Sequence, residues 1–307
     1  MTATLLPGAG TSAVGIDVGG TKIAAGVVGA DGVIRHRLRT ETPGDAAATA
    51  RALLDVVRSL AAREDIGAVG IGVPGFVDRV AGEVLVAPNL AWPHEDVAAL
   101  LHAETGLAAV LENDATAAAW GEYRFGAARG GGEVLMITVG TGIGGGLVVD
   151  GVPYRGARGM AGEIGHLRVV PDGLPCGCGS RGCWEVYASG SALARRAREE
   201  GLVGAGDPHP GRTVGAAVAA GDALALALVA ELGDWLGQGL ASLVNVLDPG
   251  LVLVGGGVAD VGDVLLDPLR SSLSAHLSGG ARAAPAVVRA ELGNDAGLVG
   301  VADLARR

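Results

Sequence analysis

A divergent internal repeat constrains the fold of this chain more than any other feature of its sequence. Residues 13–22 read AVGIDVGGTK, residues 135–142 read LMITVGTG, and an apolar run follows each of them. Each pattern predicts two antiparallel strands joined by a tight glycine turn. Downstream of each lies Asn-Asp-Ala, at 113–115 and 294–296, where we expect a helix that begins on an acid. Two related halves that face one another predict a cleft between them.

The length and the order of the predicted elements indicate a two-lobed α/β protein. At 307 residues the chain exceeds the usual size of one domain. Around the two hairpins, short apolar runs alternate with helical patterns, which is typical of sheets covered by helices. We expect a small lobe formed by residues 1–113 with a C-terminal helix at 296–307, and a large lobe formed by residues 114–295.

All three cysteines lie within one short segment that glycines interrupt. Cys176, Cys178 and Cys183 follow His166, and three thiolates with one imidazole at this spacing predict a tetrahedral Cys₃His zinc site. Four protein ligands leave no open position for water, so the predicted zinc is structural. The alternative is three buried cysteines beside a core histidine, but chance would scatter three cysteines along the chain.

Two glutamates, Glu163 and Glu185, flank the predicted zinc ligands without completing the ligand set. Because the zinc is expected to be structural, the chemistry is expected beside it. Both carboxylates are then available to accept hydrogen bonds from a hydroxylated substrate.

Glycines at the ends of three predicted strands indicate a nucleotide cleft. Asp17 ends the first buried strand, where it could hold Mg²⁺, and the glycines after it leave backbone N–H groups open to an anion. One glycine hairpin is equally typical of a simple turn. A second hairpin allows a polyphosphate to be held between two halves, and glycines after a third strand leave flat backbone for an adenosine. The predicted nucleotide contacts are Asp17, Gly19, Gly20, Thr21, Lys22, Thr138, Gly140, Thr141, Gly142, Gly255, Gly256 and Gly257.

Asp114 is the predicted general base. It follows Asn113 at a helix N-terminus, where the helix dipole and free amides favour an ionised carboxylate with a pKa near the usual value of about 4. Asp114 would accept a proton from a sugar hydroxyl that attacks the γ-phosphoryl group. Asp114 could alternatively serve only as a helix cap, and Asp295 is the competing acid, ranked second because no polar cluster surrounds it in the sequence.

Charge and hydropathy exclude several other functions. A net charge of −10 without a basic run argues against binding to a nucleic-acid backbone. The start of the chain lacks the pattern of a signal peptide, and polar residues interrupt the longest apolar stretch, Ala223 to Leu247, which we interpret as a buried helix. Clustered cysteines with metal-ligand spacing favour a reducing, cytoplasmic location.

Taken together, these motifs resemble the ROK family of sugar kinases, and within it the bacterial ATP-dependent glucokinases. The resemblance covers nearly the whole chain. The motifs that carry it are D-x-G-G-T-K at 17–22, G-x-P-G at 72–75, P-N-L-x-W at 88–92, E-N-D-A at 112–115, T-x-G-T-G-I-G-G-G at 138–146, and G-E-x-G-H at 162–166 followed by C-x-C-G-x-x-G-C-x-E at 176–185.

The resemblance implies a two-lobed actin-like ATPase fold with mixed sheets, ATP and Mg²⁺ in the cleft, and Asp114 as the base that helps convert glucose to glucose 6-phosphate. It implies a homodimer or a homotetramer. It also implies zinc held by His166, Cys176, Cys178 and Cys183. The sugar contacts that it implies are Asn89, Asn113, Asp114, Glu163, His166 and Glu185.

Three alternatives remain from the sequence. A kinase of N-acetylmannosamine or another hexose would share the same motifs. A polyphosphate-dependent glucokinase is expected to need a long cationic track, of which the single lysine, Lys22, gives no sign. A sugar-sensing repressor needs a helix-turn-helix before the first hairpin, where this chain has only about a dozen residues without helical period.

Overall fold

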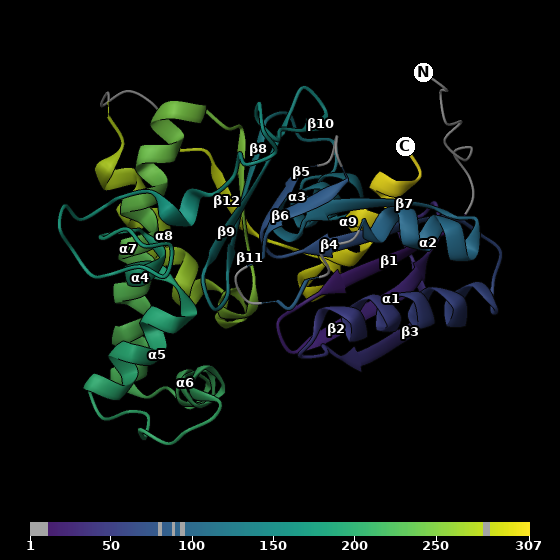
Figure 1. Ribbon diagram of the computed structural model, residues 1–307. Helices are drawn as coiled ribbons and strands as arrows, with labels where there is room; N and C mark the ends of the chain where they lie inside the picture. The colour runs from purple at the N-terminus through teal and green to yellow at the C-terminus, as the bar shows by residue number, and fades with distance from the viewer. Residues whose placement is uncertain (1–11, 79–81, 88–89, 93–95, 279–282) are drawn as a thin grey trace.

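The computed structural model describes residues 12–78, 82–87, 90–92, 96–278 and 283–307. Two five-stranded sheets organise these residues (Figure 1). The first has the order β3-β2-β1-β4-β7 and consists of β1 (Ser12–Val18), β2 (Lys22–Val28), β3 (Ile34–Glu41), β4 (Ile66–Val73) and β7 (Ala108–Asn113). The second has the order β10-β9-β8-β11-β12 and consists of β8 (Val134–Val139), β9 (Ile143–Val149), β10 (Val152–Pro153), β11 (Leu251–Gly255) and β12 (Ala286–Arg289).

The two sheets share one topology. In each, the first three strands in sequence form an antiparallel meander, and the last two add parallel to the first of them. A separate antiparallel pair, β5 (Phe76–Asp78) and β6 (Glu83–Val86), lies beside the first sheet. The predicted internal repeat and the mixed sheets are confirmed.

Both predicted glycine hairpins form. The β1–β2 turn closes with Val18 paired to Ile23, and the β8–β9 turn closes with Val139 paired to Ile143. Successive side chains along a strand point to opposite faces of the sheet. Both faces of each sheet carry buried apolar side chains. In the second sheet, for example, Ile137 belongs to a different buried cluster from Met136.

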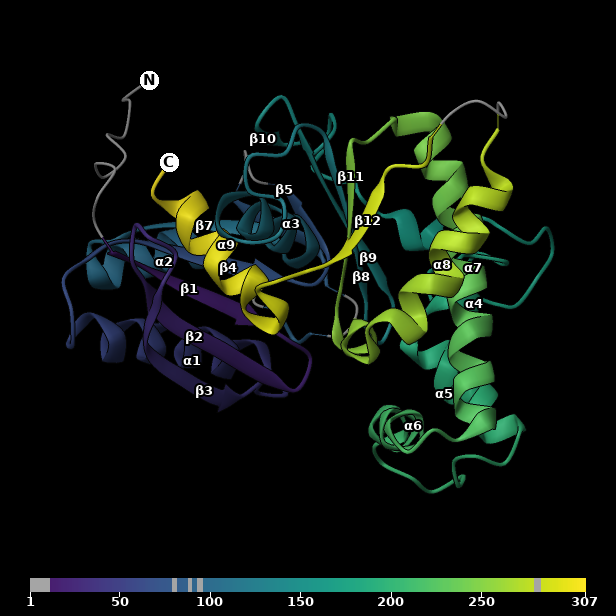
Figure 2. The same ribbon diagram turned by 180° about the vertical axis from the view of Figure 1, so that it is seen from behind.

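Each half contributes its last helix to the sheet of the other half. Helix α3 (Asp114–Phe125) follows the first sheet but packs on β8 and β9 of the second, whereas α9 (Ala296–Ala305) follows the second sheet but packs on β1 and β4 of the first. The two helices contact one another between the sheets (Figures 1 and 2). Glycines make this approach possible, since a Cβ at Gly300 would clash with the Ala117 carbonyl of α3.

The remaining helices cover the outer faces of the two sheets. The first sheet packs against α1 (Ala46–Ala61) and α2 (Val97–Thr105), each capped by an aspartate at its N-terminus. The second packs against α7 (Ala223–Leu247) and α8 (Asp263–His276). The short helices α4 (Glu185–Ala188), α5 (Gly190–Glu199) and α6 (Pro210–Ala219) follow the cysteine segment.

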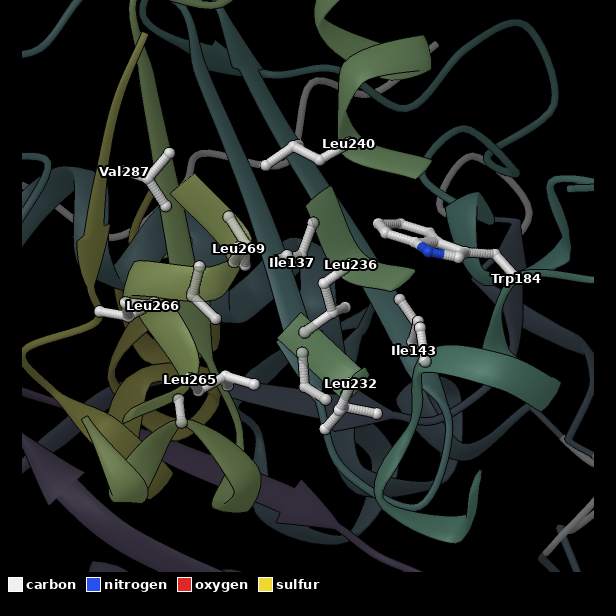
Figure 3. Packing of buried hydrophobic residues seen from close by; sticks show 14 of the residues in the cluster. Ile137, Ile143, Trp184, Leu232, Leu236, Leu240, Leu265, Leu266, Leu269 and Val287 are labelled. Carbon is white, nitrogen blue, oxygen red and sulfur yellow. The ribbon is translucent and has the colours of Figure 1, made fainter. Parts of the chain in front are cut away.

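Helix α7 forms the centre of the larger core. Leu232, Leu236 and Leu240 of α7 belong to the same buried cluster as Ile137 of the second sheet (Figure 3). Among the described residues, α7 is the one helix long and apolar enough to cross a membrane, and half of its most apolar window is buried in the protein. Its packing agrees with the predicted buried helix.

The predicted lobe boundaries stay a prediction. The helix expected at 296–307 lies on the first sheet, with which the prediction grouped it, and α3 lies on the second. Helix α8 and the strands β3 and β12 were not singled out from the sequence.

Candidate active site

A cavity of about 1170 Å³ opens where β1, β8 and the first turn of α3 meet the cysteine segment. The structure brings most of the predicted site residues to its wall. They are Asp17, Gly19, Gly20, Thr21, Asn113, Asp114, Thr138, Gly140, Thr141, Gly142, Glu163, His166, Glu185 and Gly256. Asn89 lies outside the described residues.

Three of the predicted nucleotide contacts lie outside the cavity lining. Lys22 is exposed at the first residue of β2. Gly255 packs inward, because a Cβ there would lie 2.7 Å from Cε of Met136. Gly257 begins a 3₁₀ turn that ends at Val261. Between them, Gly256 does reach the cavity, in a left-handed conformation (φ +84°) pressed against Val139 that only glycine can adopt without strain.

Asp114 opens α3 at the floor of the cavity. Its Oδ1 accepts a hydrogen bond from the Ala115 amide at 2.8 Å. Burial raises the pKa of Asp114 to about 7, and the negative charges of Asp17 and then Glu163 add to this shift. The expected pKa near 4 was therefore wrong, since desolvation outweighs the helix N-terminus and its amides. A pKa near neutrality suits a general base.

Asp17 lies at the end of β1 and also faces the cavity. Burial raises the pKa of Asp17 to about 6, and the positive charge of Lys22 partly offsets this effect. The carboxylate is mainly ionised at neutral pH. The Gly19 amide closes the turn by donating to the Lys22 carbonyl at 2.9 Å, and the Gly20 amide follows it in the cavity lining. One negative charge beside a backbone N–H fits a divalent cation bound to phosphates.

Asn113 holds the start of α3 in place through both ends of its side-chain amide. Oδ1 accepts from the Thr116 amide at 2.9 Å and caps the helix, while Nδ2 donates to the Gly75 carbonyl at 3.1 Å. The Gly-x-Pro-Gly turn at 72–75 is thereby tied to the residue before Asp114. One Nδ2 hydrogen and one Oδ1 lone pair remain for a substrate hydroxyl.

The cysteine segment brings the four predicted metal ligands together. One ligand atom from each of His166, Cys176, Cys178 and Cys183 lies within 4.8 Å of all the others. The Sγ atoms of Cys178 and Cys183 are 3.7 Å apart, and Cys176 Sγ is 3.7 Å from His166 Nδ1. Zinc–sulfur bonds of about 2.3 Å in a tetrahedron place neighbouring sulfurs about 3.8 Å apart. The donor set and its spacing therefore fit a tetrahedral metal ion.

The flanking glutamates connect this cluster to the cavity. Glu185 Oε1 accepts from Cys176 Sγ at 3.1 Å and lies 3.6 Å from His166 Nδ1. On the other side of the imidazole, Nε2 lies 3.9 Å from Glu163 Oε2. Burial raises the pKa of Glu163, an effect that His166 reduces and the charge of Glu185 increases. The ring of His166 thus has one nitrogen toward the cysteines and the other toward the cavity.

Several lining residues were missed from the sequence. Gly75 ends the Gly-x-Pro-Gly motif and Phe76 follows it; the motif was recognised in the resemblance, but none of its residues was predicted to line the site. Ser191 and Arg195 line the cavity from α5, whose start at Gly190 is fixed by a hydrogen bond from its amide to the Gly140 carbonyl at 2.7 Å. Their spacing of four residues places both on one face of a helix, a signal that was available in the sequence.

The competing acid, Asp295, does not line the cavity. Its two carboxylate oxygens accept hydrogen bonds from the guanidinium of Arg37 at 2.6 and 2.8 Å, on the surface of the first sheet. Asp295, ranked below Asp114 as a candidate base from the sequence, therefore lies away from the proposed site.

Comparisons with known proteins agree with the fold and the motifs. The ROK family model matches residues 13–307. A glucokinase of Streptomyces coelicolor is 46% identical, over 95% of this chain and 97% of its own length. A ROK family glucokinase from Streptomyces griseus, solved in complex with glucose and AMPPNP, is 47% identical with a TM-score of 0.86, over 96% of this chain and 99% of its own. A ROK hexokinase from Thermus thermophilus is 40% identical with a TM-score of 0.78, over 95% and 96% of the two chains. With its two-lobed actin-like ATPase fold, this chain belongs to the ROK family.

Proposed function

We propose that this protein is a glucokinase that transfers the γ-phosphoryl group of Mg²⁺-ATP to the 6-hydroxyl of glucose. The observation that carries the proposal is the position of Asp114, a carboxylate with a pKa near neutrality in a cavity walled by two glycine hairpins and by Glu163, His166 and Glu185. Glucokinases of about the same length share nearly half of the sequence, and one of them was solved with glucose and an ATP analogue.

Asp114 acts as the general base in this reaction. The 6-hydroxyl proton passes to Asp114 as the sugar oxygen forms a bond to the γ-phosphorus, and the bond from that phosphorus to the bridging oxygen breaks to release ADP. Because the transition state of phosphoryl transfer is loose, the proton can move late, and positioning provides most of the catalysis. The carboxyl must be deprotonated before each turnover, which its pKa of about 7 permits under neutral conditions.

The glycine hairpins and Asp17 hold the nucleotide. Backbone amides at Gly20 and Gly142 lie in the cavity lining, where they can donate to phosphate oxygens, whereas the amides of Gly19 and Gly140 close the two turns by donating to the carbonyls of Lys22 and Gly142. Asp17 would hold Mg²⁺, directly or through water, and the ion would neutralise phosphate charge as the bond from the γ-phosphorus to the bridging oxygen breaks.

Zinc is the proposed metal of the cysteine segment, with His166, Cys176, Cys178 and Cys183 as its ligands. The closed set of four ligands makes it a structural ion that fixes the loop. With Nδ1 of His166 facing the cysteines, the other ring nitrogen is free to face a sugar hydroxyl.

The proposed sugar contacts are all polar residues. They are Asn89, Asn113, Asp114, Glu163, His166 and Glu185. Each buried acceptor that a deoxygenated sugar left unmatched would cost about 1–3 kcal/mol, so this set favours a hexose with all its hydroxyls. We also propose a cytoplasmic location, which agrees with cysteines arranged as metal ligands. The proposed assembly is a homodimer or a homotetramer.

A phosphoryl-transfer assay tests the function directly. Mg²⁺-ATP is supplied with glucose, mannose, fructose, N-acetylglucosamine or N-acetylmannosamine, and polyphosphate is tried as a second donor. We expect the highest kcat/KM with ATP and glucose, and a loss of about 10²–10⁴-fold in kcat for Asp114→Asn. Turnover confined to an N-acetylated sugar, or to polyphosphate, would contradict the assigned substrates.

A further inference from the structure

We propose that Arg155 is a positioning residue, whose buried ion pair with Glu112 fixes the start of α3 relative to the loop that carries Glu163. The proposal rests on the proposed function and adds to it a residue outside the cavity wall. Arg155 follows β10 of the second sheet, and Glu112 lies on β7 of the first. The pair therefore joins the two halves directly behind the proposed base.

The contact is short and largely shielded from water. Nε and Nη2 of Arg155 lie 2.7 and 2.6 Å from the same oxygen, Oε2 of Glu112. The Glu112 side chain is 4% exposed and that of Arg155 is 20% exposed. Nη1 of Arg155 also donates to the Pro153 carbonyl at 3.2 Å, which holds the guanidinium against β10 of the second sheet.

On the side of the base, Glu112 uses its second oxygen. Oε1 accepts a hydrogen bond from the Asn113 amide at 3.2 Å. Asn113 caps α3 through Thr116 and contacts Gly75, so one carboxylate connects Arg155 to the backbone from which Asp114 projects. A displacement of Glu112 is therefore transmitted to the first turn of α3.

On the side of the sugar, Arg155 begins a closed loop. Its carbonyl accepts from the Ala161 amide at 3.0 Å, and Glu163 follows two residues later. At the tip of the loop, Gly159 has a φ of +74° and presses on the Val77 carbonyl of β5 so closely that no Cβ would fit. The loop is thus held to the first half at two points, Arg155 and Gly159.

Stability alone does not require this arrangement. A buried ion pair gains little over well-packed apolar side chains of the same volume, because desolvating both charges is costly. Its directed hydrogen bonds do determine where Asp114 and Glu163 lie relative to one another. A misplacement of about 1 Å between reacting groups can reduce a rate by about 10²-fold.

The test compares Arg155→Met, Glu112→Gln, the double variant and Arg155→Lys with a matched control, Arg306→Met. Arg306 is another buried arginine, paired with Asp303 of α9 at 3.1 Å. It also donates to the carbonyls of Val28 and Gly29 at the end of β2, and none of these partners lines the cavity. We expect kcat/KM for glucose to fall about 10- to 100-fold in Arg155→Met and Glu112→Gln, with little further loss in the double variant. The KM for ATP should change less than twofold, and Arg155→Lys should recover part of the activity.

Hydrogen exchange supplies a readout that does not need turnover. In Arg155→Met the amides of Asn113 and Ala161 should exchange faster, whereas Arg306→Met should leave both unchanged. Lost thermal stability with normal kinetics and exchange in Arg155→Met would overturn the proposal, as would an equal kinetic loss in Arg306→Met. If the wild-type protein phosphorylated no sugar while Arg155→Met still loosened both amides, the positioning role would stand and the proposed function would fail.

Discussion

The negative charge of Asp17 raises the pKa of Asp114 across the floor of the cavity. Burial is the larger cause of that shift, and it raises the pKa of Asp17 as well, to about 6. Two carboxyl groups that titrate close to neutrality therefore share one site, and protonation of either removes a group that the proposed reaction uses.

Activity should consequently rise with pH. Because Asp114 must be deprotonated to accept a proton, kcat/KM for glucose at saturating Mg²⁺-ATP should increase through pH 6–7 and level off above it. A cation held at Asp17 would cancel the smaller cause of the raised pKa of Asp114, the Asp17 charge, but not burial, so with Mg²⁺ bound the limb should lie toward the lower end of this range. A profile that stays flat down to pH 5 would contradict the role of Asp114.

Asp114→Asn should stabilise the protein while greatly reducing its activity. The pKa of this carboxyl is about 7 in the folded state and 3.8 without the fold, so the unfolded state releases the proton more readily. The stabilisation that protonated Asp114 contributes to the wild-type fold near pH 4 is therefore lost progressively as pH rises to about 7. Urea unfolding should show the variant more stable by on the order of 1–3 kcal/mol at pH 8, with the difference shrinking toward pH 4. A constant difference at both pH values would show that the carboxyl is not the cause.

The two acids that begin related helices can be compared directly. Asp114→Asn should reduce kcat by about 10²–10⁴-fold. Asp295→Asn should change kcat less than twofold and cost at most about 1 kcal/mol of stability, because its partner Arg37 is exposed. Steady-state kinetics of both variants under one set of conditions decides between them, and an inactive Asp295→Asn protein would reverse the assignment.

Loss of the metal should act mainly on the sugar. Cys178 is exposed while Cys176 and Cys183 are buried, so Cys178→Ser removes the ligand whose replacement disturbs the core least. Metal content, measured by mass spectrometry, should fall, and the KM for glucose should rise because His166, Glu163 and Glu185 lose their fixed positions. The KM for ATP should change little. An unchanged KM for glucose in metal-depleted protein would argue against this coupling.

The close packing of α3 and α9 predicts a contrast between two glycines of one helix. At Gly300 an added Cβ would clash with the Ala117 carbonyl, whereas at Gly297 the nearest atom would be 3.7 Å away. Gly300→Ala should reduce the free energy of unfolding by about 1–3 kcal/mol. Gly297→Ala should be neutral or slightly stabilising, since alanine favours helices. Chemical denaturation of both variants checks the prediction, and equal effects would refute it.

The sequence predicted those parts of the site that form from residues close together along the chain. The hairpins after Asp17 and Thr138, the helix that begins at Asp114 and the ligand cluster around Cys178 each follow from a short run of residues. The pKa of Asp114 could not be predicted in this way, because desolvation depends on all the atoms that surround the cavity. Lys22 was expected at the nucleotide from its neighbours, yet the first residue of β2 is exposed beyond the turn.

Contacts between distant segments were the main omission. Glu112 was recognised only as part of a motif, and its partner Arg155 lies in a loop without any pattern of its own. The pair of Arg37 with Asp295 joins residues near the two ends of the chain. Such pairs depend on how the two sheets are placed, which a single sequence does not specify.

The exchange of α3 and α9 between the two sheets is the geometry of a domain-swapped dimer contained within one polypeptide. A chain of half the length, with one sheet and one final helix, could build the same helix pair and the same cavity by associating with a copy of itself. Such a dimer would present two equivalent acids. In the present chain the two have diverged: Asp114 faces the cavity, and Asp295 holds Arg37 on the surface.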